Sequence, residues 1–229
     1  LGTPASKIVI WEEAATNFMV SVADAIKHPS IGTAVLICHE IGPREGDVIS
    51  MRAPEHYENG NFRFTTSKTA AKLTIPATSR LRERLESEGV PLHRHLVVTD
   101  VRKKKYKADN FRHVFAEVRA TAGAIMCVQA VAEVFFGAPR AFVDVSGLLY
   151  RQLRHTAIVN LARAGCTVPE IASITGHSIK TVTQILEHYL PRDSVVASHA
   201  ISKLEFYRTR TYVQRPCPTP VQRPEPKLS

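Results

Sequence analysis

The sequence predicts a mainly α-helical domain of the α+β type that carries a small antiparallel β-sheet. Apolar residues recur at helical spacing over Trp11 to Lys27, and do so again over Arg151 to Tyr189. Between these regions, Asn61 to Pro76 alternates apolar and polar residues in two short runs, as a β-hairpin does. With 229 residues, the chain is long enough for one sizeable core and a small appendage.

Charge and cysteine usage narrow the classes of function. The net charge of +9 favours a polyanionic partner, and no apolar run of membrane-spanning length or signal peptide is visible. The four cysteines are far apart and form no C-x-x-C pair, so the sequence suggests neither a disulfide framework nor a zinc site. We therefore expect a cytoplasmic protein that needs no metal and no cofactor and has no membrane partner.

The first half of the chain predicts two helices and a turn. Residues 1–9 are expected to be a linker, and the helix over Trp11 to Lys27 ends at the following Pro-Ser pair. A second helix is expected over Ile31 to His39, followed by a turn and a helix start that places Arg44 near its opening. A cation is unfavourable at a helix N-terminus. Arg44 is therefore either simply exposed or directed at an anion.

The hairpin over Asn61 to Pro76 places Lys68 near its tip, where a lysine can be merely solvated or can serve a site. Helices are expected over Thr78 to Leu85 and Asp109 to Ala124, and irregular chain over Phe135 to Pro139. A basic run lies before the second of these helices. It is either a phosphate-contacting segment or a solvated loop, and its cations are Arg102, Lys103, Lys104, Lys105 and Lys107.

Three helices are expected next. The first covers Arg151 to Ala164 and ends at a glycine. Thr167 and Glu170 form a capping box for the second, and Ser178 caps a third that ends near Tyr189. A further helix is expected over Val195 to Phe206. Residues 207–229 repeat a VQRP motif and are expected to form a disordered, proline-rich basic tail.

The candidate site combines cations, a histidine and a tyrosine. Arginine and histidine side chains can hold a phosphodiester and spread its charge, and a tyrosine can attack its phosphorus. Each residue also has a structural interpretation: the histidine can cap a helix, and the tyrosine follows the apolar pattern of its helix. The arginine inside the apolar helix requires a partner, and a bound phosphate is one that fits. The set is Arg44, Lys68, Arg151, Arg154, His177 and Tyr189.

In this order and spacing, the motifs resemble those of the tyrosine recombinase, or phage integrase, family over residues 10–206. The segments that carry the resemblance are GPREGDVISM with Arg44, SKTAAKLTIP with Lys68, LRHTA with Arg154, TGHS with His177 and HYLPRD with Tyr189. The resemblance implies a catalytic domain that cleaves DNA through a 3′-phosphotyrosyl bond. In it, Tyr189 would be the nucleophile and Lys68 the general acid.

The sequence departs from the family pattern at two positions. Arg151 stands where the family usually has a histidine, and arginine cannot act as a base at neutral pH. In the best-known members the tyrosine follows the histidine by nine residues, a place that Leu186 occupies here. Tyr189 comes three residues later, on a similar helix face but about 4.5 Å further along the axis.

The resemblance also implies partners. We expect double-stranded DNA, a monomer when free and a homotetramer on DNA, with Val195 to Phe206 passed to a neighbouring subunit. We expect a bacterial or phage-encoded, DNA-associated protein. Because the sequence starts at Leu1, we expect it to be a fragment of a longer protein with a separate N-terminal DNA-clamping domain.

Two other classes of function fit part of the sequence. Residues 167–186 read as helix, glycine turn and helix, as in the helix-turn-helix of a non-catalytic DNA-binding regulator. Such a regulator would not need the hairpin lysine or the Gly-Pro-Arg segment, although a recombinase-like protein that has lost cleavage could retain them. A relaxing activity of the topoisomerase IB type would use the same chemistry without a paired synapse.

Overall fold

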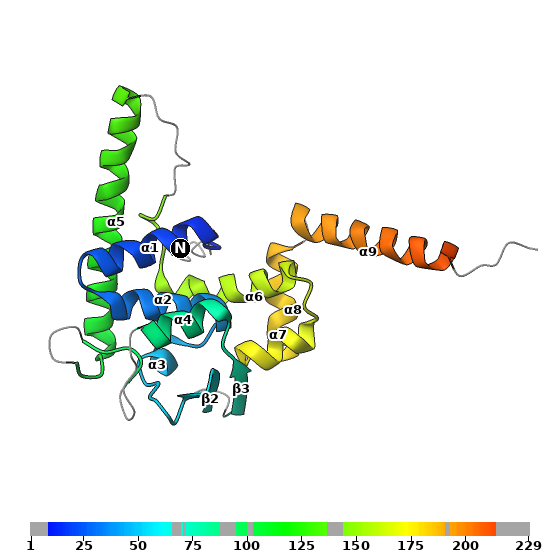
Figure 1. The fold of residues 1–229 in the computed structure, drawn as a ribbon, viewed down its shortest axis with the longest axis horizontal. Coiled ribbons are helices and arrows are strands. Elements are labelled where there is room, and N and C mark those ends of the chain that lie inside the picture. Colours follow the sequence, from blue (N-terminus) through cyan, green and yellow to red (C-terminus); the bar gives the residue numbers. More distant parts are fainter. Residues whose placement is uncertain are drawn as a thin grey trace, which may run out of the picture. The chain divides into compact units, whose positions relative to one another are not determined.

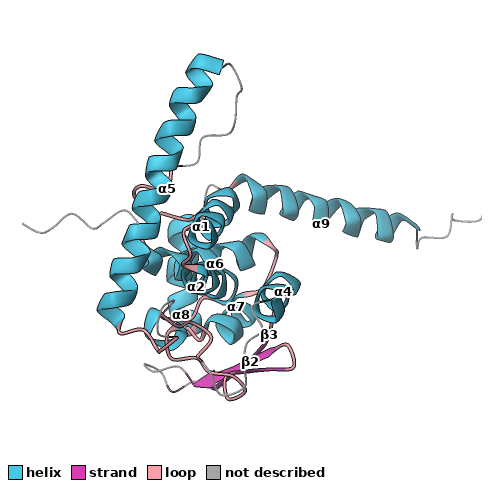
Figure 2. Ribbon diagram, turned by 60° about the vertical axis from the view of Figure 1, so that its left-hand side comes forward, coloured by secondary structure: helices cyan, strands magenta, loops and turns pink. Residues whose placement is uncertain are grey.

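A computed structural model of the chain describes residues 9–65, 70, 72–87, 95–99, 103–136, 144–190 and 193–213. Contacts divide the chain into two units, Leu1–Pro191 and Arg192–Ser229. The first unit is largely helical, with a small antiparallel sheet at its edge (Figures 1 and 2). This architecture confirms the predicted fold class. The predicted catalytic range, 10–206, runs through both units and stays a prediction.

Helix α2 (Pro29–Ile41) is the centre of the first unit. All its residues from Ser30 to Ile41 except Glu40 are buried, which is the pattern of a helix surrounded by protein. It contacts α1 (Glu13–Ala25) and also α3 (Glu45–Val48), α4 (Ser79–Ser87), α5 (Ala108–Phe136) and α6 (Leu153–Arg163). The helix therefore connects the two halves of the unit.

The sheet has the strand order β1-β2-β3 and is antiparallel throughout. Its strands are β1 (Tyr57–Glu58), β2 (Asn61–Thr65) and β3 (Lys72–Pro76). Phe62 pairs with Ile75 and Phe64 with Leu73, and all four side chains are buried on one face, so the predicted alternation is confirmed. The predicted hairpin tip with Lys68 lies outside the described residues.

Helices α4 and α5 support this core from the side. Arg84 of α4 forms a bidentate ion pair with Asp24 of α1, with distances of 2.7 and 2.6 Å. Helix α5 runs from Ala108 to Phe136 and is longer than predicted. The prediction of irregular chain was wrong at Phe135 and Phe136, because the residues before them are good helix formers and Gly123 does not end the helix.

A three-helix group completes the first unit. A 3₁₀ turn (Tyr150–Gln152) precedes α6, so the predicted first turn of that helix is tighter than expected. Helices α7 (Val168–Thr175) and α8 (Ile179–Tyr189) follow, and the three pack around Ile158, Ile171 and Val182. The predicted caps are present: Thr167 accepts from the Glu170 amide, and Ser178 accepts from the Thr181 amide.

The second unit contains α9 (Ser194–Val213). The helix is longer than the predicted Val195 to Phe206. Residues 207–213, expected to begin a disordered tail, are helical, while the rest of the tail lies outside the described residues. Exposed apolar side chains, such as Ile201 and Phe206, lie along α9.

Candidate active site

Arg44 is positioned by the end of α2. Gly42 takes the left-handed conformation there, with φ of 65°, and the chain turns so that Arg44 becomes the N-cap of α3. Glu45 and Asp47 in the first turn of α3 compensate the helix dipole. The Nη1 atom of Arg44 is buried and has no hydrogen-bond partner within the described part of the chain. Arg44 thus offers a buried donor, not an exposed charge.

Arg154 reaches the same place from the second residue of α6. Its Nη1 atom donates to the Gly42 carbonyl oxygen, and its Nε atom donates to His177 Nε2 at 3.1 Å. Its Nη2 atom is buried without a partner among the described residues. Burial, and then the neighbouring charge of Arg44, lower the pKa of Arg154 to about 10. Two arginines from distant segments therefore meet, each with a donor left over.

His177 lies in the turn between α7 and α8. The Thr175 hydroxyl donates to the Ile171 carbonyl at 2.8 Å, so its oxygen can accept the Nδ1–H of His177 at 3.0 Å. This assigns the proton to Nδ1 and leaves Nε2 as the acceptor from Arg154. Burial, followed by the charges of Arg154 and Arg44, lowers the pKa of His177 to about 3. The imidazole is therefore neutral at physiological pH.

Tyr189 is the last residue of α8 and is half-buried. Its ring centroid lies 6.4 Å from that of His155, the residue after Arg154, and 4.8 Å from that of His188. Burial raises the pKa of the phenol. Tyr189 is not among the fully buried core side chains, and its ring lies beside the first turn of α6.

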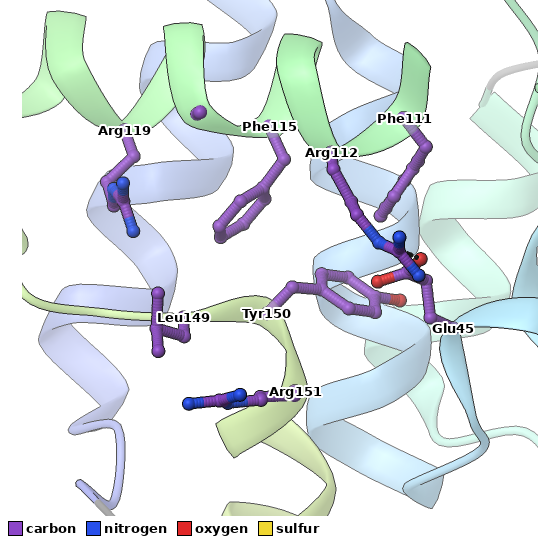
Figure 3. A pocket seen from close by; sticks show the side chains of 9 residues that line it. Glu45, Phe111, Arg112, Phe115, Arg119, Leu149, Tyr150 and Arg151 are labelled. Carbon is purple, nitrogen blue, oxygen red and sulfur yellow. Dashed lines mark hydrogen bonds and ion pairs between the residues drawn. The ribbon is translucent and has the colours of Figure 1, made fainter. Parts of the chain in front are cut away.

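Arg151 lies three residues before Arg154, on the 3₁₀ turn that leads into α6. It is exposed on the 3₁₀ turn and lines a cavity of about 340 Å³ between that turn and α5 (Figure 3). Phe111, Phe115 and Tyr150 form the aromatic wall of this cavity, with T-shaped ring contacts among them. The structure thus brings Arg44, Arg154 and His177 together and places Arg151 against an aromatic pocket.

The basic run is only partly described. Arg102 and Lys68 lie outside the described residues. Lys103, Lys104, Lys105 and Lys107 are exposed around the buried ring of Tyr106. The Lys104 amide donates to the Thr99 hydroxyl at 3.1 Å, which helps to close the turn that presents these cations.

Two contributors to this arrangement were not predicted. Gly42 supplies the carbonyl that orients Arg154, and Thr175 fixes the tautomer of His177. The threonine directly before the Gly-His pair was a usable signal, because a hydroxyl in the last turn of a helix can reach the turn that follows. The Gly42 carbonyl had no such signal, since its contact spans 112 residues.

The described residues contain no group of three or more His, Cys, Asp or Glu side chains arranged to hold a metal ion. None of the helices in the described part of the chain has the length and apolar character needed to cross a membrane.

No protein-family model matches the chain, and no curated protein is similar to it. Solved structures do match. The crystal structure of XerA recombinase has a TM-score of 0.58 at 16% identity, over 94% of this chain and 67% of that one. The catalytic domain of bacteriophage HP1 integrase has a TM-score of 0.55 at 18% identity, over 87% of this chain and 95% of that one.

A lambda integrase dimer bound to a COC′ core site matches with a TM-score of 0.59 at 16% identity. The match to this lambda integrase covers 82% of the present chain but only about half (51%) of the integrase. The match to XerA covers about two thirds (67%) of XerA. The chain therefore has the fold of the tyrosine recombinase catalytic domain.

Proposed function

We propose that the chain is the catalytic domain of a site-specific DNA recombinase, which cleaves and rejoins double-stranded DNA through a 3′-phosphotyrosyl intermediate. The observation that carries this proposal is the pair of buried donors, Arg44 Nη1 and Arg154 Nη2, that have no partner among the described residues. Burying unsatisfied cationic donors is costly, so a site that retains two of them is suited to an anion.

A phosphodiester supplies the missing acceptors. Its non-bridging oxygens would accept from Arg44 and Arg154, and the same contacts strengthen as charge builds up on a pentavalent phosphorane. By analogy with other preorganised donors, each arginine contributes on the order of 10²–10³ in rate. His177 holds Arg154 in place through Nε2 at 3.1 Å. Lys68 is proposed as the general acid for the departing 5′-oxygen, and Arg151 as a further phosphate-binding cation.

Tyr189 is the proposed nucleophile. Its hydroxyl oxygen forms a bond to phosphorus as the bond to the 5′-oxygen breaks, and the DNA 3′-phosphate stays attached to the protein. Because the bond energy is conserved in the phosphotyrosine, another 5′-hydroxyl can reverse the step without a cofactor. Tyr189 is half-buried at the end of α8, so its ring is not enclosed in the core.

We also propose how the chain engages DNA. The exposed lysines 103, 104, 105 and 107, with Arg102, contact phosphates on either side of the cleaved bond. The matched lambda integrase structures are a dimer on a core site and a tetramer on a Holliday junction. By this likeness we propose a DNA-associated protein that is monomeric when free and tetrameric on DNA.

A non-catalytic regulator is the second candidate, and one observation favours it. Helices α7 and α8 form a helix-turn-helix, and Ile179 and Lys180 are exposed at the start of the second helix. Against it, the turn contains His177, whose Nε2 atom accepts from Arg154 Nε at 3.1 Å. A regulator has no need for that contact.

Covalent capture separates the two candidates. Duplexes of randomised sequence with a nick near the centre are incubated with the protein, and products are resolved by denaturing electrophoresis. We expect a protein–DNA adduct, lost in Tyr189→Phe and retained in Tyr207→Phe, which alters an exposed tyrosine of α9. Sequencing the captured DNA gives the preferred site. Noncovalent retardation without any adduct would instead support the regulator.

A further inference from the structure

The strand-transfer reaction needs a group that accepts the tyrosine proton. A phenol attacks phosphorus efficiently only as it loses its proton, and burial raises the pKa of Tyr189. Arg151 stands where a histidine would be expected, and a guanidinium cannot accept a proton at neutral pH. It lines the aromatic cavity of Figure 3, together with Glu45, the residue after Arg44.

His177 does not fill this role in the described arrangement. Its Nδ1–H is directed at Thr175 Oγ1 at 3.0 Å, and its Nε2 accepts from Arg154 Nε at 3.1 Å. Accepting a further proton at Nε2 would break the contact that orients Arg154. Burial, and then the charges of Arg154 and Arg44, oppose protonation and lower the pKa of His177 to about 3.

His155 is a second imidazole near the reacting groups. It follows Arg154 in α6 and is half-buried, and its ring centroid lies 6.4 Å from that of Tyr189, with 38° between the planes. Within the described residues, no hydrogen bond to its ring is found. The 6.4 Å between the ring centroids places this imidazole beside the phenol.

We propose that His155 accepts the proton of the Tyr189 hydroxyl as that oxygen attacks the phosphodiester. This inference rests on the strand-transfer function proposed above. The O–H bond of Tyr189 breaks and its proton moves to an imidazole nitrogen, while the oxygen forms the bond to phosphorus. The P–O5′ bond breaks, and the leaving oxygen takes its proton from the general acid, the role assigned to Lys68. On religation both protons return.

The electrostatics around His155 suit a base that is activated by substrate. Burial, and then the charge of Arg154, lower the pKa of His155, so the ring is neutral and able to accept a proton in the free protein. A phosphodiester bound to Arg154 offsets that cation and makes the imidazole more basic when a proton must be taken up. Among the described residues, His177 and Tyr189 are titratable groups near His155, and His188 contacts Tyr189.

His188 is the competing base and supplies the matched control. Its ring meets that of Tyr189 edge-on, with centroids 4.8 Å apart, but it is exposed and precedes Tyr189 on the same helix. Two neighbouring residues on a helix point in different directions. We expect His188→Ala to leave the rate of adduct formation unchanged.

The test measures single-turnover adduct formation on a captured duplex with wild type, His155→Ala, His155→Asn and His188→Ala. Each histidine variant is also made with a fluorinated, more acidic tyrosine at position 189. We expect both His155 variants to form adduct about 100-fold more slowly than wild type while binding the duplex normally. Imidazole in the buffer should partly restore His155→Ala, and the fluorinated tyrosine should reduce the loss in both variants.

The outcomes separate this inference from the function on which it rests. If wild type forms no adduct, the strand-transfer function itself is wrong. If wild type forms adduct and both His155 variants match its rate, His155 is not the proton acceptor. A loss that neither imidazole nor the fluorinated tyrosine reduces would also overturn the inference, since only a structural role predicts it.

Discussion

Arg44 and Arg154 are residues whose positions oppose the stability of the free protein. Both present a buried Nη atom without a hydrogen-bond partner in the described part of the chain, and burial, followed by the charge of Arg44, lowers the pKa of Arg154. Two like charges that are held close together and away from water destabilise the folded protein. A bound anion would offset this cost. Such strain is common where binding, and not stability, has been selected.

Replacing Arg44 by glutamine should therefore stabilise the free protein. We expect a gain of about 1 kcal/mol, or a rise of about 2–4 °C in Tm, measured without DNA. Arg112→Gln is the control, because Arg112 is 62% exposed and its ion pair with Glu45 should contribute little. If Arg44→Gln instead lowers Tm, Arg44 has a stabilising partner and is not held ready for an anion.

His177 makes stability depend on pH. Its pKa is about 3 in the folded protein and near 6.5 when unfolded, so the unfolded state binds more protons between these values. Stability is then fully present above pH 6.5 and is lost as pH falls towards 3. Allowing for solvent screening at a half-buried ring, we expect a loss of about 1 kcal/mol between pH 7.5 and 5.5.

Denaturant unfolding at both pH values, with wild type and His177→Asn, measures this contribution. The variant cannot take up the proton, so its unfolding free energy should change less across the interval. Saturating inorganic phosphate should also reduce the loss in wild type, because a bound anion favours the imidazolium. An identical pH dependence in the two proteins would mean that His177 is not held neutral.

At the scale of elements, the joint between α2 and α3 determines where the arginines meet. Gly42 has φ of 65°, and a Cβ atom there would lie 3.1 Å from Ala157 Cβ and 3.4 Å from Thr175 Cγ2. Its carbonyl also accepts from Arg154. One residue thus brings the end of α2 close to α6 and α7, the helices that carry Arg154 and lead into His177.

We expect Gly42→Ala to destabilise the protein by about 1–3 kcal/mol, because alanine is strained at this φ and its methyl group is crowded. Adduct formation should fall further than the loss of folded protein explains, since Arg154 loses its orientation. Gly46→Ala is the matched control in the next element: its Cβ would meet open space, and its φ is not positive. Equal behaviour of the two variants in thermal unfolding would contradict this account.

The sequence correctly predicted the helices and strands that depend on residues close to one another in the chain. The capping box at Thr167, the cap at Ser178 and the alternation over β2 and β3 act within a few residues, and all are present. Strand β1, of two residues, is too short to show a pattern, and α5 continues because nothing in its sequence stops it. The sequence was enough to select Arg44, Arg154 and His177 as candidate site residues. It was not enough to predict the contacts that these residues make.

The positions of Arg151 and His155 show why part of the candidate site could not be predicted from the sequence. Both are close to Arg154 in sequence, yet one lines the cavity beside α5 and the other approaches Tyr189. The spacing of residues on a helix predicts the direction in which each side chain points. It does not predict which residue that side chain contacts, because the contacted residue belongs to a distant segment of the chain.

For the whole molecule, the fold is shared with integrases at 14–18% identity, so it depends on burial pattern and not on particular core residues. The net charge of +9 adds a field that attracts a polyanion from any direction. The exposed lysines 103, 104, 105 and 107 concentrate part of it on one turn.

Changing these four lysines to glutamine should reduce the salt dependence of DNA binding. Each phosphate contact contributes about 0.9 to the slope of log Kobs against log salt, so the slope should decrease by about 3 to 4. The four-fold change to arginine keeps the charge and should preserve the slope. Equal slopes in the glutamine and arginine variants would place the phosphate contacts elsewhere.

The measurement that tests the central claim most directly is mass spectrometry of a proteolysed protein–DNA adduct. Trypsin should release the segment from Thr181 to Arg192, in which Tyr189 is the sole tyrosine. We predict that this peptide carries the mass of a nucleotide joined through its 3′-phosphate to Tyr189. DNA attached to any other residue, or adduct formation that persists in Tyr189→Phe, would contradict the assignment of Tyr189 as the nucleophile.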